Sequence, residues 1–277
     1  MFAHYVSIAF RNIRSAPFAS IVNLLTLAVG LVCFVTAYAF VTFWGAAERH
    51  FPKSDDISVL TATIKNRENG FGIASMLRVP EIAAETLKSD FPAISKIARA
   101  LVIDRQAMVA SGDRAIRLFG VAVDPEFLEM FDLPFISGDS SALSTPRSAV
   151  LTKEYATRLF GTDSPIGKSI VIGNAVDATV TGVIDAIPEP SHMGRSANAM
   201  LPFDMLTSRD VGDAIQGSNF AGAPPGSEWF RINALVYVYL PAGGLSASSL
   251  RSQLVGFAER HIPEAMRRTQ DYTASSR

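Results

Sequence analysis

One uncharged segment near the start of the chain constrains what the rest can fold into. Residues 15–47 carry no charged side chain, and residues 21–44 within them are almost wholly apolar. The 24 residues of that run form a helix of about 36 Å, which crosses a hydrocarbon core of about 30 Å with some tilt. The sequence therefore predicts a transmembrane helix over 19–46, and everything after it must fold in water.

A cleaved secretory signal is the main alternative to a permanent anchor. Such signals have an apolar core of about 7–15 residues and a small-x-small cleavage site, and the triplets at 37–39 and 45–47 fit that site. We expect a retained span, because the apolar run is longer than a signal requires. Arg11 and Arg14 precede the run and no acidic residue does, which favours a cytoplasmic N-terminus and an exported main domain.

The faces of the first two segments are also informative. Small and weakly polar residues recur on one side of the span: Asn23, Thr26, Gly30, Cys33 and Ala37. Such a stripe predicts a packing face, because small side chains let another helix approach closely. Apolar residues recur at steps of three or four over 1–18, which predicts an amphipathic helix on the membrane surface. The alternatives are ordinary scattered small residues in the span and a plain flanking segment before it.

The water-facing part excludes several classes of protein. Residues 48–277 carry all 26 acidic residues and 23 of the 25 basic ones, so their net charge is about −3. No basic block is present, which argues against nucleic acid as a partner. The only cysteine is Cys33, in the span, so the rest of the chain has no disulfide or thiolate chemistry and must depend on its hydrophobic core.

Hydrophobic periodicity predicts an α+β domain. An early strand and helix and a late strand and helix flank other material, which indicates one domain interrupted by an inserted lobe. The strands expected are 57–64, 97–109, 115–123, 133–136, 149–151, 169–172, 177–184 and 232–240, and the helices are 80–91, 125–131, 153–160 and 246–261. We expect an exposed loop over 217–226 and a turn at 173–174.

No catalytic or cofactor site stands out. Residues 161–169 resemble a phosphate-binding loop, but five residues separate the glycines instead of four, and the segment leaves a helix and enters a strand. The four histidines lack partners at metal-ligand spacing, and His192, in a turn-rich stretch, is expected to be solvated. We therefore expect no cofactor and no metal, and an enzyme is unsupported.

The order of short motifs resembles that of MacB/FtsX-like ABC-transporter permeases, and specifically their MacB-like periplasmic core domain. The basic opening IAFRNIR at 8–14 resembles the family's segment before its first span, and the densest match is VDPEFLEMFDLPF at 123–135. Further matches lie in family order at 49–57, 87–92, 97–99, 138–139, 149–152, 159–161, 165–168, 179–184 and 187–188. The resemblance covers nearly the whole chain.

This resemblance implies a non-catalytic subunit that transmits ATP-driven motion across the membrane for export or for regulation of envelope proteins. It implies a porter-like part at 47–120 and 225–265 with a sabre-like inserted lobe at 121–215, all within a core domain at 47–277. It also implies partners: a cytoplasmic ABC ATPase subunit, a second permease copy or repeat, and membrane lipid, with a periplasmic protein as a further candidate. Phe10, Arg11 and Arg14 would then lie near the ATPase or the lipid headgroups.

The sequence departs from the family in one respect. These permeases have four spans per unit, whereas this chain has only the first and ends in polar residues over 264–277. We therefore expect a fragment of a longer permease or a truncated product. A free-standing, singly anchored periplasmic binding module remains the alternative, and an anchored exported enzyme would need a convergent polar pocket.

Overall fold

The computed structural model divides the chain into two compact units, Met1–Ala47 and Glu48–Arg277, which we describe separately. It describes residues 11, 14–64, 76–173, 175–195, 199–216, 227–264 and 270–275. The first unit contains helix α2, Pro17–Gly45. Pro17 suits the first turn, where its missing N–H would have had no partner. Among the described residues, α2 is the one helix long and apolar enough to cross a membrane, and none of its side chains is buried.

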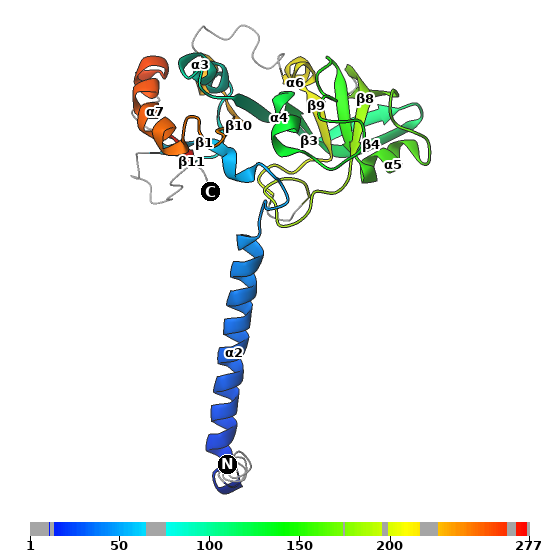
Figure 1. Cartoon of the computed structure of the whole chain (residues 1–277). Coiled ribbons are helices and arrows are strands. Elements are labelled where there is room, and N and C mark those ends of the chain that lie inside the picture. The colour runs from blue at the N-terminus through cyan, green and yellow to red at the C-terminus, as the bar shows by residue number, and fades with distance from the viewer. Residues whose placement is uncertain are drawn as a thin grey trace. The chain divides into compact units, whose positions relative to one another are not determined.

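The second unit is built on one hydrogen-bonded sheet (Figure 1). Its described strands follow the order β11-β1-β10-β3-β4-β9-β6-β8-β5, with β2 beside β10 and β7 beside β3 and β8. The strands are β1 (Ile57–Ile64), β2 (Val79–Pro80), β3 (Lys96–Ser111), β4 (Arg114–Val123), β5 (Phe135–Ser137), β6 (Ser148–Thr152), β7 (Ser169–Ile172), β8 (Val176–Ile184), β9 (Met205–Ser208), β10 (Ile232–Tyr239) and β11 (Gln270–Ser275). The pairs β4–β9 and β6–β8 are parallel and the others antiparallel.

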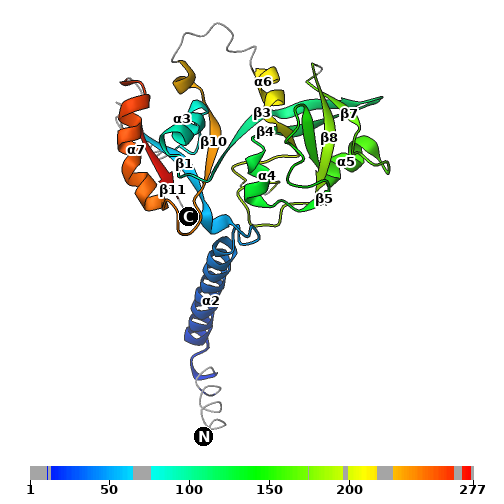
Figure 2. The ribbon, with the colours of Figure 1, turned by 45° about the horizontal axis from the view of Figure 1, so that its top comes forward.

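Helices cover different parts of this sheet. They are α3 (Ile82–Asp90), α4 (Glu126–Phe131), α5 (Lys153–Phe160), α6 (Arg209–Gln216) and α7 (Ala247–His261), with short 3-10 turns η1 (Ser54–Asp56) and η3 (Ser227–Phe230). Helices α3 and α7 lie at the end that holds β1, β10 and β11, whereas α5 lies at the end that holds β7 and β8 (Figures 1 and 2). Strands from the start and the end of the unit pair with one another, since β1 lies between β10 and β11, and the fold is α+β as predicted.

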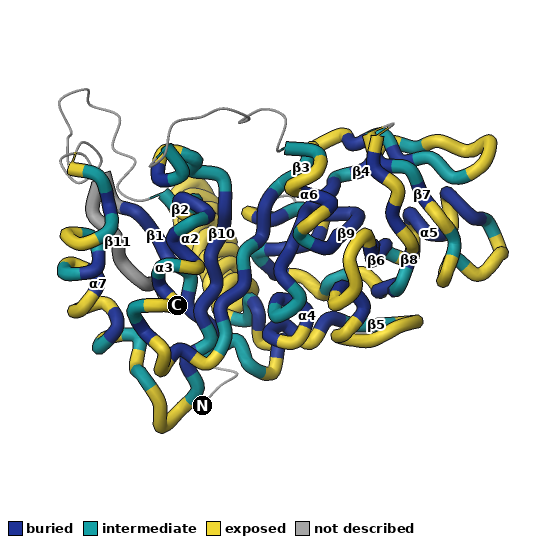
Figure 3. The backbone as a smooth tube through the Cα atoms, turned by 90° about the horizontal axis from the view of Figure 1, so that it is seen from above, coloured by how far each residue is buried: buried dark blue, intermediate teal, exposed yellow. Residues whose placement is uncertain are grey.

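Strand β10 shows how the core is divided. Side chains alternate between the two faces of a strand, and Ala234, Val236 and Val238 accordingly join one hydrophobic cluster with α3 and α7. Leu235 and Tyr237 join a second cluster on the other face, which includes α4. Figure 3 shows β10 as mostly buried along its length, whereas α7 carries many exposed positions. We call the first of the two hydrophobic clusters the α3–α7 cluster and the second the α4 cluster.

Strand β3 connects the two ends of the sheet. Its first residues pair with β10, and Val109 and Ala110 pair with β7. Between them its register against β4 shifts at Asp104, so a few residues are out of step with the partner strand. Beyond that irregularity Ala107 and Val109 join a third hydrophobic cluster, which includes residues of α5 and which we call the α5 cluster. One strand thus runs through both halves of the core domain.

Most predicted elements are confirmed, and the differences have local causes. The helix expected from residue 80 begins at Ile82, because Pro80 pairs with Ile232 as part of β2. Strand β9 and helix α6 were not predicted. The polar tail was not expected to form a strand, yet β11 pairs with β1. The loop over 217–226 lies outside the described residues, as does Asn174 of the expected turn.

Candidate functional site

Glu48, the first residue of the second unit, is almost fully buried. Its backbone has a φ of 62°, a left-handed conformation that is uncommon for a residue with a Cβ, and its N–H donates to the Pro190 carbonyl at 3.1 Å. The carboxylate accepts hydrogen bonds from the Ser191 hydroxyl at 3.1 Å and from the backbone N–H of His192. Burying a carboxylate is costly unless donors replace its lost hydration, and the 190–192 loop supplies them.

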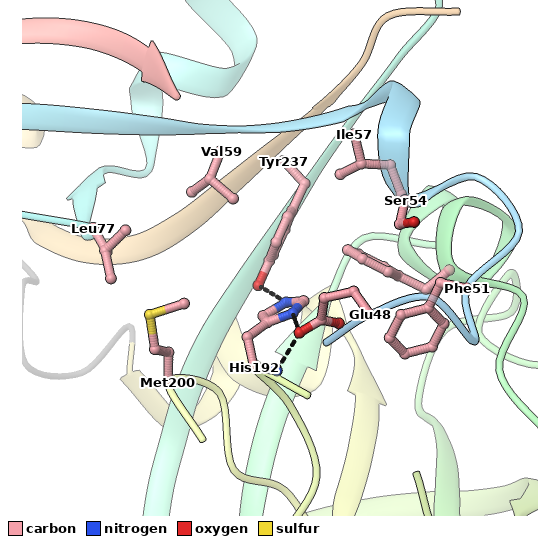
Figure 4. A pocket seen from close by; sticks show the side chains of 10 residues that line it. Glu48, Phe51, Ser54, Ile57, Val59, Leu77, His192, Met200 and Tyr237 are labelled. Atoms are coloured by element: carbon pink, nitrogen blue, oxygen red, sulfur yellow. Dashed lines mark hydrogen bonds and ion pairs between the residues drawn. The ribbon is translucent and has the colours of Figure 1, made fainter. Parts of the chain in front are cut away.

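The His192 ring extends this network to strand β10. Its Nδ1 lies 3.0 Å from the Glu48 carboxylate and its Nε2 lies 3.0 Å from the Tyr237 hydroxyl (Figure 4). A neutral imidazole has one N–H, so an Nδ1–H that donates to Glu48 leaves Nε2 to accept from Tyr237. Burial, together with the charge of Glu48, raises the pKa of Tyr237 well above its ordinary value. Tyr237 therefore stays a protonated donor.

An apolar cavity lies beside this Glu48–His192–Tyr237 chain (Figure 4). Its volume is about 180 Å³, and its other lining residues come from η1, β1, α4 and three connecting segments: Phe51, Ser54, Ile57, Val59, Leu77, Phe131 and Met200. Most of these side chains are hydrophobic, and Leu77 and Met200 are partly exposed, at 36% and 45%. The cavity therefore combines an apolar wall with one polar end.

The polar end shows no arrangement for nucleophilic catalysis among the described residues. The Ser191 hydroxyl donates to Glu48 and accepts from the Met193 N–H at 3.2 Å, so both of its hydrogen-bonding roles serve the loop. No group of three or more His, Cys, Asp and Glu residues in the described part of the chain could hold a metal ion. The hydrogen bonds of Glu48, His192 and Tyr237 instead connect three segments that are far apart in sequence: the start of the second unit, the 190–192 loop and strand β10.

Two ion-pair clusters connect the same parts of the domain. Arg99 on β3 donates to both oxygens of Asp124 at 2.8 and 3.0 Å, and to Glu85 on α3 at 2.7 Å. Although burial alone lowers the pKa of Arg99, its bonds to Asp124 outweigh that effect and raise it. In the second cluster Glu81 pairs with Arg209 of α6 and with Arg231 at 2.7 Å. Both clusters therefore connect elements of the α3–α7 half to elements of the other half.

The predicted packing residues of the span lie on α2, within the first unit. Asn23, Thr26 and Gly30 line a shallow groove along the helix together with Leu27 and Leu31. The Thr26 hydroxyl donates to the Val22 carbonyl at 2.8 Å, so its proton is used within the helix. Cys33 and Ala37 are exposed on the same helix. Their role as a packing face stays a prediction.

The predicted coupling residues are only partly described. Arg11 and Arg14 are helical and exposed, whereas Phe10 and most of the expected surface helix over 1–18 lie outside the described residues. Residues 161–169, which resemble a phosphate-binding loop in sequence, follow helix α5, which ends at Phe160, and lead into strand β7, which begins at Ser169. This order of helix and strand is the one predicted, and it is the reverse of that in a phosphate-binding loop.

Comparisons with known proteins identify the family. The sequence profile of the MacB-like periplasmic core domain matches residues 20–246. The chain therefore belongs to the MacB-like periplasmic core domain family, found in MacB/FtsX-like ABC-type permeases, and the resemblance drawn from the motifs is confirmed. No curated protein matches the chain.

Three solved structures show the same fold. A domain of a protein assigned as a permease from Porphyromonas gingivalis is 20% identical, with a TM-score of 0.61, over 83% of this chain and 92% of that one. The periplasmic region of MacB from Actinobacillus actinomycetemcomitans is 11% identical, with a TM-score of 0.51 over 80% and 89%. The extracellular domain of the noncanonic ABC-type transporter YknZ from Gram-positive bacteria is 16% identical, with a TM-score of 0.50 over 79% and 99%.

Family membership carries a coarse functional statement. The second unit is the periplasmic core domain of an ABC-transporter permease, a class that is typically non-catalytic and that partners an ATPase subunit. Together with the single candidate span among the described residues, it indicates anchoring in the inner membrane.

Sequence reasoning missed the residues of the site itself. His192 was expected to be solvated, but this prediction is wrong: its side chain is 14% exposed and packs between Glu48 and Tyr237. A run of turn-forming residues predicts an exposed side chain only where no distant segment packs against it, and here Glu48 and Tyr237 both contact the His192 ring. The one local signal was Glu48 itself, an acidic residue directly after an uncharged run.

Proposed function

We propose that this chain is the first span and periplasmic core of an ABC-permease subunit that passes ATP-driven motion from the membrane to the periplasm, for export or for regulation of envelope proteins. In this proposal the N-terminus is cytoplasmic and the core domain is periplasmic. Arg11 and Arg14, with Phe10, meet the ATPase or the lipid headgroups. The division into a porter-like part and an inserted lobe belongs to the same proposal, and the α3–α7 cluster, whose buried members all fall within 47–120 and 225–265, supports it.

The observation that carries the proposal is the placement of Glu48. It follows the end of α2 by three residues, and its backbone and carboxylate are both bonded to the 190–192 loop. That loop in turn reaches β10 through Tyr237. A displacement of the chain at Glu48 would therefore act on buried, hydrogen-bonded groups of both halves of the core, where packing resists local deformation.

Co-purification tests the assembly. The protein is expressed with a candidate cytoplasmic ABC ATPase subunit, and the membrane extract is examined for one complex with altered ATP hydrolysis. Association supports the proposal, whereas a protein that leaves the membrane without an ATPase contradicts it and favours the singly anchored binding module. Charge reversal at Arg11 and Arg14 should weaken the association.

Substitutions in the span test the packing face. Gly30→Leu should reduce assembly, because a large side chain would fill the groove beside Asn23 and Thr26. Val32→Leu, on the opposite side of the helix, is the matched control and should leave assembly unchanged. Equal behaviour of the two variants would remove the packing face from the proposal.

The transmission step needs its own readout in the assembled complex. Hydrogen exchange of the 190–193 backbone should respond to ATP in the wild-type complex, and this response should be lost in Glu48→Ala while ATP hydrolysis persists. Glu48→Gln, which keeps an acceptor, should retain part of the response. An unchanged response in Glu48→Ala would mean that motion reaches the core by another route.

A further inference from the structure

We propose that the cavity beside Glu48, His192 and Tyr237 is a binding site for a small uncharged molecule with one apolar ring or short alkyl chain. This goes beyond the transport role, since binding depends neither on the ATPase nor on the span. Three features support it: the size of the cavity, the chemistry of its wall and the charge at its polar end.

The size fits one ring. The cavity volume is about 180 Å³, slightly more than the roughly 150 Å³ of an engineered apolar protein cavity that stays dry and binds benzene. A cavity of this size accommodates a monocyclic aromatic molecule with one small substituent.

The wall supplies apolar contacts from rigid and adaptable side chains. Phe51 and Phe131 are 2% and 3% exposed and stack edge to face, with ring centres 5.4 Å apart, so this side of the cavity is fixed. Leu77 and Met200 lie on the other side (Figure 4) and are partly exposed. Methionine adapts its shape to irregular apolar surfaces, so this side can adjust to an entering molecule.

The polar end selects against anions. Glu48 places a buried negative charge there, and the N–H and O–H groups of His192 and Tyr237 are already used in the chain of hydrogen bonds. A bound anion would meet the carboxylate, and the further donor in the lining, the neutral Ser54 hydroxyl, does not offset that charge. The Tyr237 oxygen retains acceptor capacity, so a neutral molecule with one hydroxyl fits best. Arg78, whose charge also acts on Tyr237, does not line the cavity and donates to the Asn233 carbonyl.

The test is methyl NMR on the full chain in lipid nanodiscs, with its eight methionines labelled at the ε-methyl carbon. The Met200 signal is assigned with Met200→Leu, and benzyl alcohol is the probe. We expect a saturable shift of the Met200 methyl, while the methyl of Met205, which is buried in the α5 cluster and does not line the cavity, stays unchanged. Benzoate, the anionic analogue, should bind at least tenfold more weakly.

Two variants separate site binding from partition into lipid. Val59→Phe places a ring in the cavity and should abolish the saturable shift. Leu77→Trp does the same from a partly exposed position whose substitution leaves the core intact, so it serves if Val59→Phe fails to fold. A shift that rises linearly with concentration, that persists in Leu77→Trp, or that benzoate reproduces equally would overturn the proposal.

Discussion

Removing the Glu48 carboxylate should be among the most destabilising single changes in the core domain. Glu48→Ala leaves the Ser191 hydroxyl and two N–H groups of His192 without their acceptor, and Glu48 itself is 4% exposed, so water does not readily replace it. Each buried donor that loses its acceptor costs about 1–3 kcal/mol, and for these three donors together we expect a loss of about 3–5 kcal/mol. For a domain of this size each kcal/mol lowers Tm by about 2–4 °C, which gives a fall of about 6–20 °C.

The assay is urea denaturation of the full chain in detergent, followed by fluorescence. Of the two tryptophans, Trp229 lies in the α3–α7 cluster and Trp44 in α2, so the measurement is made in a Trp44→Phe background. Glu48→Gln keeps one acceptor for His192 and offers its amide to the Ser191 oxygen, and should cost about 1–2 kcal/mol as charge-assisted bonds become neutral ones. Glu259→Ala, an exposed position on α7, should change stability by less than about 0.5 kcal/mol.

The ranking of these variants decides the matter. If Glu48→Ala unfolds at the same urea concentration as Glu259→Ala, the carboxylate is not a buried acceptor in solution and the reasoning fails. If Glu48→Gln costs as much as Glu48→Ala, the charge itself stabilises the fold, and the hydrogen-bond argument must be replaced by an electrostatic one.

Three further predictions concern the rest of the core. Asp124→Asn should cost about 1.5–3 kcal/mol in urea denaturation, because it weakens the charge-assisted hydrogen bonds of a partly buried ion pair, whereas Glu85→Gln, an exposed partner of the same arginine, should cost less than about 1 kcal/mol; equal costs would contradict this. The pKa of Asp90 is held below its ordinary 3.8 by the hydrogen bond from Arg260, so its stabilisation is full above that pH and is lost as pH falls through the lower, folded value. The stability difference between wild type and Asp90→Asn should therefore shrink below about pH 4, and a difference that grows there would count against it. Gly182→Ala places a Cβ 2.9 Å from an aromatic carbon and 3.1 Å from a valine methyl, and thermal denaturation should show a loss of about 1–3 kcal/mol, with no loss meaning that the core relaxes freely.

The fold was predictable wherever a segment carried its own periodic signal. The apolar run over 232–240 predicts the strand observed as β10, and the structure places its odd and even positions in different clusters. Ser246 accepts a hydrogen bond from the Ser249 N–H, so α7 begins where an N-cap residue predicts. Pairing between distant segments was not predictable in the same way. Strand β11 has no strong apolar alternation and is ordered by its partner β1, which a local pattern does not reveal.

The residues of the candidate site were even less predictable from local sequence patterns. Glu48 and His192 are separated by 144 positions, and each occurs in a segment whose own composition indicates a turn or a flanking region. A buried carboxylate is stable only because donors from another segment surround it, so its role follows from tertiary packing and not from residue type. The same physical reason makes the site informative once seen. The buried charge of Glu48, in a left-handed residue at the start of the domain, is held by several groups that are distant in sequence. Those groups belong to both halves of the core, and this arrangement is what the proposed transmission of motion uses.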